Sequence, residues 1–384
     1  MKRHTNLQLL FCAVLAFVLM TPYLVYARAK EVVVGVNVIN PLRAKAAEQK
    51  ALINQLADAH VRVIRCSITP DQNGINFANL AYSKGIKILL GVGPKFPADA
   101  PTRTYQPDKF PGMWSGHQLS SADPELSKAY YQELLDKLEA NGIVLAGLEL
   151  GNEINWAAFN QDFPLPGEGK VLNFHDLSHD PEGKQIAKGF LQYVKVISAL
   201  KDVRDHSRLN QNTPIISAGL VTALDGEKLY NNKKEDMVSL NATLQFLRWK
   251  GIDSLVDAYG IHFYPPDWKP GTPEGLEKRA DRFARTLTAC LPAGAATGKP
   301  CWVTEWGFDN HDLSCPTKDN NQHLLVKEMR DIFANAAEQG RLAAIIYFCW
   351  NSDPWSKKPD PKSAYRCGVL TDSGRLAISP MRAR

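Results

Sequence analysis

The sequence predicts an α/β protein: one (β/α)8 barrel with long loops at the carboxyl-terminal ends of its strands. Three observations lead to this fold class. Apolar runs rich in β-branched residues recur eight times, helical patterns lie between most of them, and no linker or low-complexity segment interrupts the series. Eight strand-and-helix units in roughly 350 residues are enough for a single barrel of this kind.

The eight predicted strands are continuous apolar runs, as is typical of parallel strands covered on both faces. They span residues 32–38, 61–68, 86–92, 143–150, 214–220, 256–263, 301–306 and 343–350. The fourth run, residues 143–150, is apolar with one interruption, at Glu149.

Helical periodicity is clearest between the third and fourth runs, where apolar residues recur at intervals of four: Leu126, Tyr130, Leu134 and Leu138. Asp123-Pro124 predicts the start of this helix and Asn141-Gly142 its end. Trp249 and Trp302 lie in helix and strand patterns, so we expect both in the core.

The predicted connections differ in length. Helix-to-strand links are short, whereas the strand-to-helix links are long and rich in Pro, Gly and aromatic residues: 93–122, 154–182, 264–274, 307–320 and 351–366. In such barrels the loops after the strands carry binding and catalytic residues, so the functional site is expected there.

Residues 1–29 are predicted to be a secretory signal peptide. Lys2 and Arg3 precede an apolar run, and Ala27-Arg28-Ala29 forms an A-x-A cleavage pattern at its end. An uncleaved membrane anchor is the alternative, because the run is long enough to span a bilayer. We expect the mature domain, residues 30–384, to be secreted or periplasmic, monomeric and without stable membrane insertion.

Composition excludes some partners and leaves room for disulfides. The formal charge of +5 is mild and no block of basic residues occurs, which argues against nucleic-acid binding. Six cysteines follow the predicted signal peptide, and six allow fifteen pairings. Cys290–Cys301 is the preferred pair and Cys315–Cys367 the second, with Cys66 and Cys349 expected as buried thiols.

The ends of the predicted strands bring chemistry-bearing side chains to one mouth of the barrel. These side chains are Arg65, Asn152, Glu153, His262, Tyr264, Glu305 and Trp350. We expect Arg65 and Tyr264 to hold the pKa of Glu305 down, while the neighbouring anion raises the pKa of Glu153. One carboxylate nucleophile and one carboxylic acid are what retaining glycosidic hydrolysis requires, with the two groups about 5–5.5 Å apart.

This ordered set of residues resembles glycoside hydrolase clan A, the retaining (β/α)8 enzymes. Within the clan it is most similar to the cellulase- and mannanase-like family 5, with a family 39-like layout as another possibility. The resemblance implies that Glu153 is the acid/base and Glu305 the nucleophile. It further implies that Asn152 binds the sugar 2-hydroxyl, that His262 positions sugar and acid, and that Trp350 forms the floor beneath the attacked sugar.

Sugar binding also favours exposed aromatic side chains, and three tryptophans in the long loops are candidates: Trp114, Trp156 and Trp268. No metal or cofactor site is predicted. Two other functions remain open: a non-catalytic carbohydrate-binding barrel, and a transglycosylase on the same fold.

Overall fold

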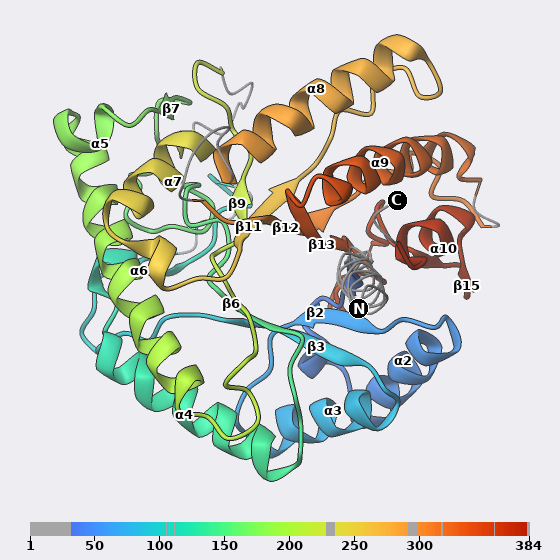
Figure 1. The fold of residues 1–384 in the computed structure, drawn as a ribbon, viewed down its shortest axis with the longest axis horizontal. Helices are drawn as coiled ribbons and strands as arrows, with labels where there is room; N and C mark the ends of the chain where they lie inside the picture. The colour runs from blue at the N-terminus through green and yellow to red at the C-terminus, as the bar shows by residue number, and fades with distance from the viewer. Residues whose placement is uncertain are drawn as a thin grey trace, which may run out of the picture. The chain divides into compact units, whose positions relative to one another are not determined.

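The computed structural model describes residues 32–381, apart from residues 105, 107, 111, 228–234, 291–297, 316–317 and 357. The predicted signal peptide lies outside the described residues. Parallel strands curl around a centre and helices surround them (Figure 1). The strands are β1 (Val33–Asn37), β2 (Val63–Cys66), β3 (Lys87–Val92), β6 (Gly147–Leu150), β8 (Ile215–Ile216), β9 (Leu220–Val221), β11 (Tyr259–Phe263), β12 (Cys301–Trp306) and β13 (Leu342–Tyr347).

The order of these strands closes a barrel. They pair as β8-β6-β3-β2-β1-β13-β12-β11-β9, and β8 and β9 are two pieces of the fifth predicted strand. One piece pairs with β6 and the other with β11, while parallel bridges from Asn152 to Gly219 and from Ile216 to Ala258 join the two sides. The nine labelled strands are therefore eight barrel strands, and the predicted fold class is confirmed.

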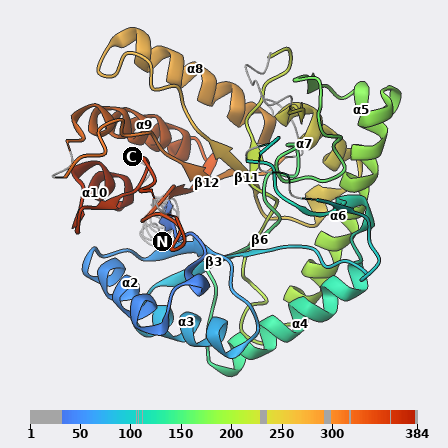
Figure 2. The same ribbon diagram turned by 180° about the vertical axis from the view of Figure 1, so that it is seen from behind.

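The outer ring of helices is seen from both sides in Figures 1 and 2. It consists of α2 (Ala46–Asp58), α3 (Gln72–Ser83), α4 (Pro124–Ala140), α6 (Pro181–Asp205), α7 (Leu240–Trp249), α8 (Pro273–Cys290), α9 (Asn320–Glu338) and the final α10 (Asp372–Ile378). The loops add the short helix α5 (Asp176–His179) and three small ladders: β4 (Thr102–Arg103) with β5 (Gly116–His117), β7 (Val171–Leu172) with β10 (Met237–Val238), and β14 (Tyr365–Arg366) with β15 (Val369–Leu370). Among the described residues, no helix has the length and apolar character needed to cross a bilayer.

Helix α4 begins and ends where its sequence predicts. The Asp123 side chain caps it by accepting hydrogen bonds from the backbone amides of Glu125 and Leu126 at 2.8 and 3.0 Å. The apolar face is only partly as predicted, because Leu126 is 46% exposed while Leu134 and Leu138 are buried. Positions four apart drift by about 40° per step, so Leu126 lies about 120° around the helix from Leu138.

The barrel interior has its own small apolar cluster, distinct from the larger layer between strands and helices. It is made of Val63, Leu89, Ile216, Ala258, Trp302, Ala344 and Ile346. Trp302 is 6% exposed, as predicted for a core residue. The same prediction for Trp249 is wrong: it is 67% exposed at the end of α7, where the Lys250 ammonium lies 3.4 Å from its ring centroid.

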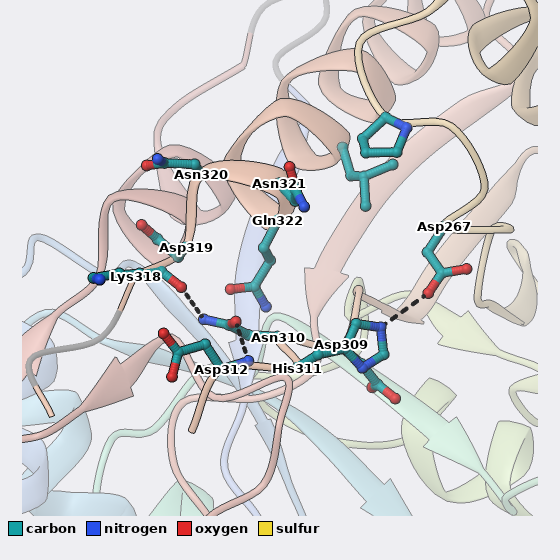
Figure 3. A pocket seen from close by; sticks show the side chains of 12 residues that line it. Asp267, Asp309, Asn310, His311, Asp312, Lys318, Asp319, Asn320, Asn321 and Gln322 are labelled. Atoms are coloured by element: carbon teal, nitrogen blue, oxygen red, sulfur yellow. Dashed lines mark hydrogen bonds and ion pairs between the residues drawn. The ribbon is translucent and has the colours of Figure 1, made fainter. Parts of the chain in front are cut away.

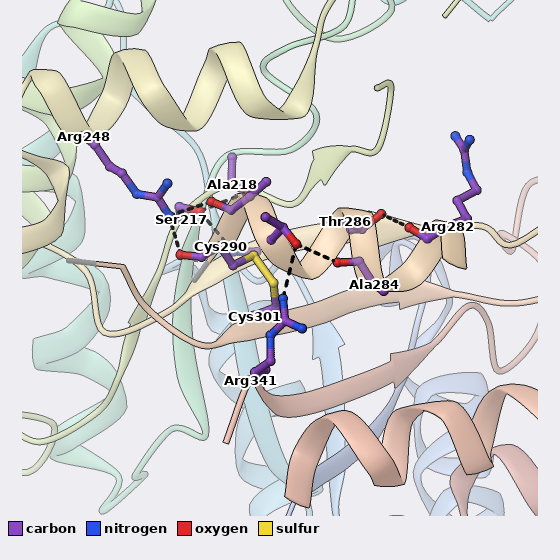
Figure 4. The surroundings of a disulfide bond; sticks show 12 residues. Ser217, Ala218, Arg248, Arg282, Ala284, Thr286, Cys290, Cys301 and Arg341 are labelled. Atoms are coloured by element: carbon purple, nitrogen blue, oxygen red, sulfur yellow. Dashed lines mark hydrogen bonds between the residues drawn. A yellow bond between two sulfur atoms is a disulfide. The ribbon is translucent and has the colours of Figure 1, made fainter. Parts of the chain in front are cut away.

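Both expected disulfides are present, and Cys66 and Cys349 are buried free thiols. The Cys290–Cys301 bond ties the end of α8 to the start of β12 (Figure 4). Beside it, Arg248 donates hydrogen bonds to the carbonyls of Ala289 and Cys290. A cation at the last carbonyls of a helix stabilises that terminus, so this corner is fixed both covalently and electrostatically.

The Cys315–Cys367 bond joins exposed loops that are 52 residues apart. Replacing both cysteines by serine is expected to lower the free energy of unfolding by up to about 4 kcal/mol, because the unfolded chain regains the entropy of a long open loop. Urea denaturation of the variant and the oxidised wild type measures this. Wild-type protein reduced under the same conditions is the control, and equal midpoints for variant and oxidised wild type would contradict the expectation.

Candidate active site

The barrel brings six of the seven groups predicted at the strand ends to one place. Arg65 lies on β2, His262 on β11 and Glu305 on β12, while Glu153 follows β6. Glu153 has a φ of +46°, which is uncommon for a residue with a side chain. Its amide donates to the carbonyl of Gly219 at 2.8 Å, so the backbone of the fifth strand holds this unusual turn.

The imidazole of His262 lies close to both glutamates. The Nδ1 atom of His262 lies 2.7 Å from Oε1 of Glu153 and 3.5 Å from Oε2 of Glu305. Glu153 and Glu305 each have a carboxyl oxygen within 4.8 Å of the other, and they are only 6% and 9% exposed. The separation is compatible with the short distance that a nucleophile and an acid share in retaining glycosidases.

Glu305 is stabilised as an anion. Nη1 of Arg65 donates to its Oε1 at 2.7 Å, and the hydroxyl of Tyr264 donates to its Oε2 at 2.6 Å. Burial alone would raise the pKa of Glu305, but the charges of His262 and Arg65 and these hydrogen bonds outweigh it, so the pKa lies below its usual value.

Glu153 is shifted in the other direction. Burial raises the pKa of Glu153 and the neighbouring charge of Glu305 adds to this, although the hydrogen bond and charge of His262 oppose it. The pKa values of two similar carboxyl groups are thus shifted in opposite directions. One shift favours the ionised form and the other favours the acid.

His262 is fixed by what surrounds it. Its Nε2 lies 3.4 Å from Nη2 of Arg65, and a guanidinium can only donate. A neutral His262 ring therefore carries its proton on Nδ1, directed at Glu153. Burial lowers the pKa of His262, but the charges of Glu305 and Glu153 and the hydrogen bond to Glu153 overcome that effect and raise it.

Two members of the site were not predicted as such. Nε of Arg65 donates to Glu149, which is fully buried on β6, and Nη1 donates to Oδ1 of Asn37 at 2.8 Å. Asn37 in turn donates to the carbonyl of Thr304 at 2.9 Å. The lone acidic interruption of an apolar run was the sequence signal for Glu149, because a buried carboxylate needs a cation.

Asn152 belongs to the same centre, whereas the predicted tryptophans differ in how exposed they are. Asn152 accepts a hydrogen bond from Nη2 of Arg65 at 3.2 Å. Trp114 and Trp268 are 50% and 44% exposed, and Trp156 is half-buried. The role expected for Trp350 needs correction: its exposed fraction is 0%, and it stacks on Tyr365 with ring centroids 5.3 Å apart. A ring covered in this way offers no face to a sugar.

The described residues that lie close enough to share a metal ion are Glu153, His262 and Glu305. Arg65 already places a positive charge 2.7 Å from Glu305, which makes binding of a further cation there electrostatically unfavourable. The arrangement therefore suits proton transfer and nucleophilic attack by the two glutamates.

Cavities lie beside this centre, along the loops after β11 and β12. A cavity of about 230 Å³ is lined by Tyr264, Gly307 and Lys362 among others. Asp267 and Asp309 line both this cavity and a larger one of about 470 Å³, shown in Figure 3. There Asp267 lies 3.4 Å from His311, and Gln322 projects from α9.

Replacing Arg65 with methionine should lower the free energy of unfolding by about 3–5 kcal/mol, because Glu149 would stay buried without its cation. The double variant Arg65→Met/Glu149→Leu should recover about half of that loss, since Glu149 is then removed and Glu305 remains without its cation. Urea denaturation of both variants tests the pairing. A double variant as unstable as the single one would contradict it.

No protein-family model and no curated protein matches this chain. Solved structures do. Fungal β-1,4-galactanases align with a TM-score of 0.51 at 15% identity, over 90% of this chain and 94% of theirs. A GH5-4 broad-specificity endoglucanase from an uncultured bacterium aligns with a TM-score of 0.52 at 14% identity, over 90% and 93%. The AHE enzyme from Alicyclobacillus herbarius aligns with a TM-score of 0.52 at 10% identity, over 90% and 95%. At these identities the similarity concerns the fold: the chain has the (β/α)8 barrel architecture of such glycoside hydrolases.

Proposed function

We propose that this protein is a retaining glycoside hydrolase of the clan A type that cleaves a β-linked poly- or oligosaccharide. The observation that carries the proposal is the pair Glu153 and Glu305, with oxygens within 4.8 Å and pKa values shifted in opposite directions. The fold similarity to galactanases and an endoglucanase supports a carbohydrate substrate.

The reaction follows from the protonation states of the two carboxyl groups. Glu305 attacks the anomeric carbon while Glu153 gives its proton to the leaving oxygen, which breaks the glycosidic bond and leaves a covalent glycosyl-enzyme. Glu153, now a carboxylate, takes a proton from a water molecule as that water attacks the anomeric carbon. This attack displaces the carboxylate of Glu305 from the anomeric carbon. The sugar is freed, and its anomeric configuration is retained.

Neighbouring groups are assigned supporting roles. Arg65 and Tyr264 hold Glu305 ionised and oriented, and His262 directs Glu153. Asn152, turned toward Arg65, is assigned the sugar 2-hydroxyl. Trp156, Trp268 and Trp114 are assigned to further sugar units.

The remaining proposals concern the form of the protein. Residues 30–384 form the catalytic domain after removal of a signal peptide, and the protein acts as a monomer outside the cytoplasm. The two disulfides support an oxidising compartment.

Replacement of each glutamate by glutamine tests the mechanism. Glu305→Gln should abolish hydrolysis of oligosaccharides and of activated aryl glycosides, because both need the nucleophile. Glu153→Gln should lower kcat/KM on oligosaccharides by about 10²–10⁴-fold and much less on 2,4-dinitrophenyl glycosides, whose leaving group needs no proton. A panel of β-galactans, β-mannans and β-glucans supplies the substrates.

The control for these variants is Glu125→Gln, an exposed carboxyl in the first turn of α4, which should keep wild-type rates. NMR of the first product formed reports its anomeric configuration. Inversion, or a Glu305→Gln protein with wild-type rates, would reject the mechanism. Saccharide binding without any turnover would favour a non-catalytic barrel.

The pH dependence of kcat/KM should be bell-shaped. Glu305 must be ionised, so activity falls as pH drops through its lowered pKa. Glu153 must be protonated, so activity falls as pH rises through its raised pKa.

Tyr264→Phe removes a hydrogen bond that favours the ionised form of Glu305. The acidic limb should therefore move to higher pH by about 1–2 units, the equivalent of one hydrogen bond to a charged group, while the basic limb stays in place. An unmoved acidic limb would show that Tyr264 does not stabilise the anion.

A further inference from the structure

Three aromatic side chains form a continuous row in the loops after β3 and β6. The ring centroids of Trp114 and Phe159 are 6.4 Å apart and those of Phe159 and Trp156 are 5.8 Å apart. Trp114 is 50% exposed and the other two are half-buried. They belong to the loops after β3 and β6, at the catalytic end of the barrel. We call these three residues the aromatic wall.

The wall is joined to Glu153 through one tight turn of backbone. The amide of Trp156 donates to the carbonyl of Glu153 at 3.0 Å, and the amide of Asn160 donates to the carbonyl of Trp156 at 2.9 Å. The buried side chain of Asn160 closes the turn by donating to the carbonyl of Ile154 at 2.7 Å. A displacement of this turn would therefore move the wall relative to the acid/base.

Arg103 clamps the turn and the wall together. It lies on the small ladder of β4 and β5, and its Nη2 donates to the carbonyls of Ala157 at 2.6 Å and Trp114 at 3.1 Å. Nη1 donates to the carbonyl of Asn160 and Nη2 also to that of Ala158, both at 3.3 Å. Two loops from different strands are thus held by one planar guanidinium, a geometry that lysine cannot reproduce.

This arginine is not part of an ion pair within the described part of the chain. Its hydrogen bonds go to backbone carbonyls, and burial without a compensating carboxylate lowers its pKa to about 10. A half-buried arginine whose hydrogen bonds all go to the backbone of these two loops has the geometry to hold them together.

We propose that the aromatic wall binds the pyranose ring of the leaving group, and that Arg103 is the positioning residue that holds the wall next to Glu153. This inference rests on the proposed function. The acid donates its proton to the leaving oxygen, so the leaving sugar lies on the side of Glu153. The wall begins three residues beyond Glu153, and the C–H face of a pyranose packs against aromatic rings.

The test compares two substrates with the same glycone, both turned over by the wild type. One is an oligosaccharide, whose leaving group is a sugar; the other is the matching glycosyl fluoride, whose leaving group is too small to reach the wall. Arg103→Lys should lower the ratio of kcat/KM on the oligosaccharide to kcat/KM on the fluoride by about 10- to 100-fold, as displacement of a binding surface does. Trp114→Ala, a change at an exposed ring, should lower the same ratio.

Arg330→Lys is the matched control. Arg330 also donates to backbone carbonyls, those of Ala377 and Pro380 at 3.2 and 3.0 Å, and burial likewise lowers its pKa to about 10. It joins α9 to the end of α10 and the segment that follows, so its replacement should leave the ratio at the wild-type value.

Each outcome decides the inference. Equal losses on both substrates in Arg103→Lys, or an unchanged ratio in both Arg103→Lys and Trp114→Ala, would overturn it while leaving the hydrolase intact. A wild type that hydrolyses neither the fluoride nor any oligosaccharide would overturn the proposed function, and this inference with it.

Discussion

The guanidinium of Arg65 is the interaction on which the rest of the site depends. It contacts Glu149 from β6 and Glu305 from β12, and it also contacts Asn37, Asn152 and His262. One cation thus holds five strand ends at a common centre. Two buried carboxylates around a single arginine would be unfavourable without these directed hydrogen bonds, since desolvation of charge is costly. The same network lowers the pKa of Glu305, while Glu153, which receives no hydrogen bond from Arg65, has its pKa raised by burial and by the charge of Glu305.

Much of this arrangement could be predicted from the sequence, because the geometry of a barrel brings the ends of its strands together. Apolar runs mark the strands, and parallel strands all end at the same mouth, so residues such as Glu153 and Glu305 meet although 152 positions separate them. The disulfide pairing followed from the same geometry, since Cys290 and Cys301 flank one helix-to-strand connection.

The details that escaped prediction depend on packing across loops. Trp350 lies at a strand end as expected, but Tyr365 from a later ladder covers its ring. In the sequence, Arg103 is one more charged loop residue. Its hydrogen bonds to carbonyls more than fifty residues away are visible only in the structure. Glu149 had a visible signal, a charge in an apolar run, but its partner could be identified only in three dimensions. Periodicity reports which residues are buried, not which neighbours they meet.

The split fifth strand shows how tightly backbone and site are matched. A Cβ atom at Gly219 would lie 2.0 Å from Nε2 of His262, so only glycine allows the imidazole to sit between Arg65 and Glu153. The carbonyl of the same glycine accepts the amide of Glu153 and holds its left-handed backbone. Gly219 lies between β8 and β9, where it forms an isolated parallel bridge to Asn152. That bridge continues the barrel wall next to Glu153, so the glycine that leaves room for the imidazole also keeps the fifth strand joined to the β6 side.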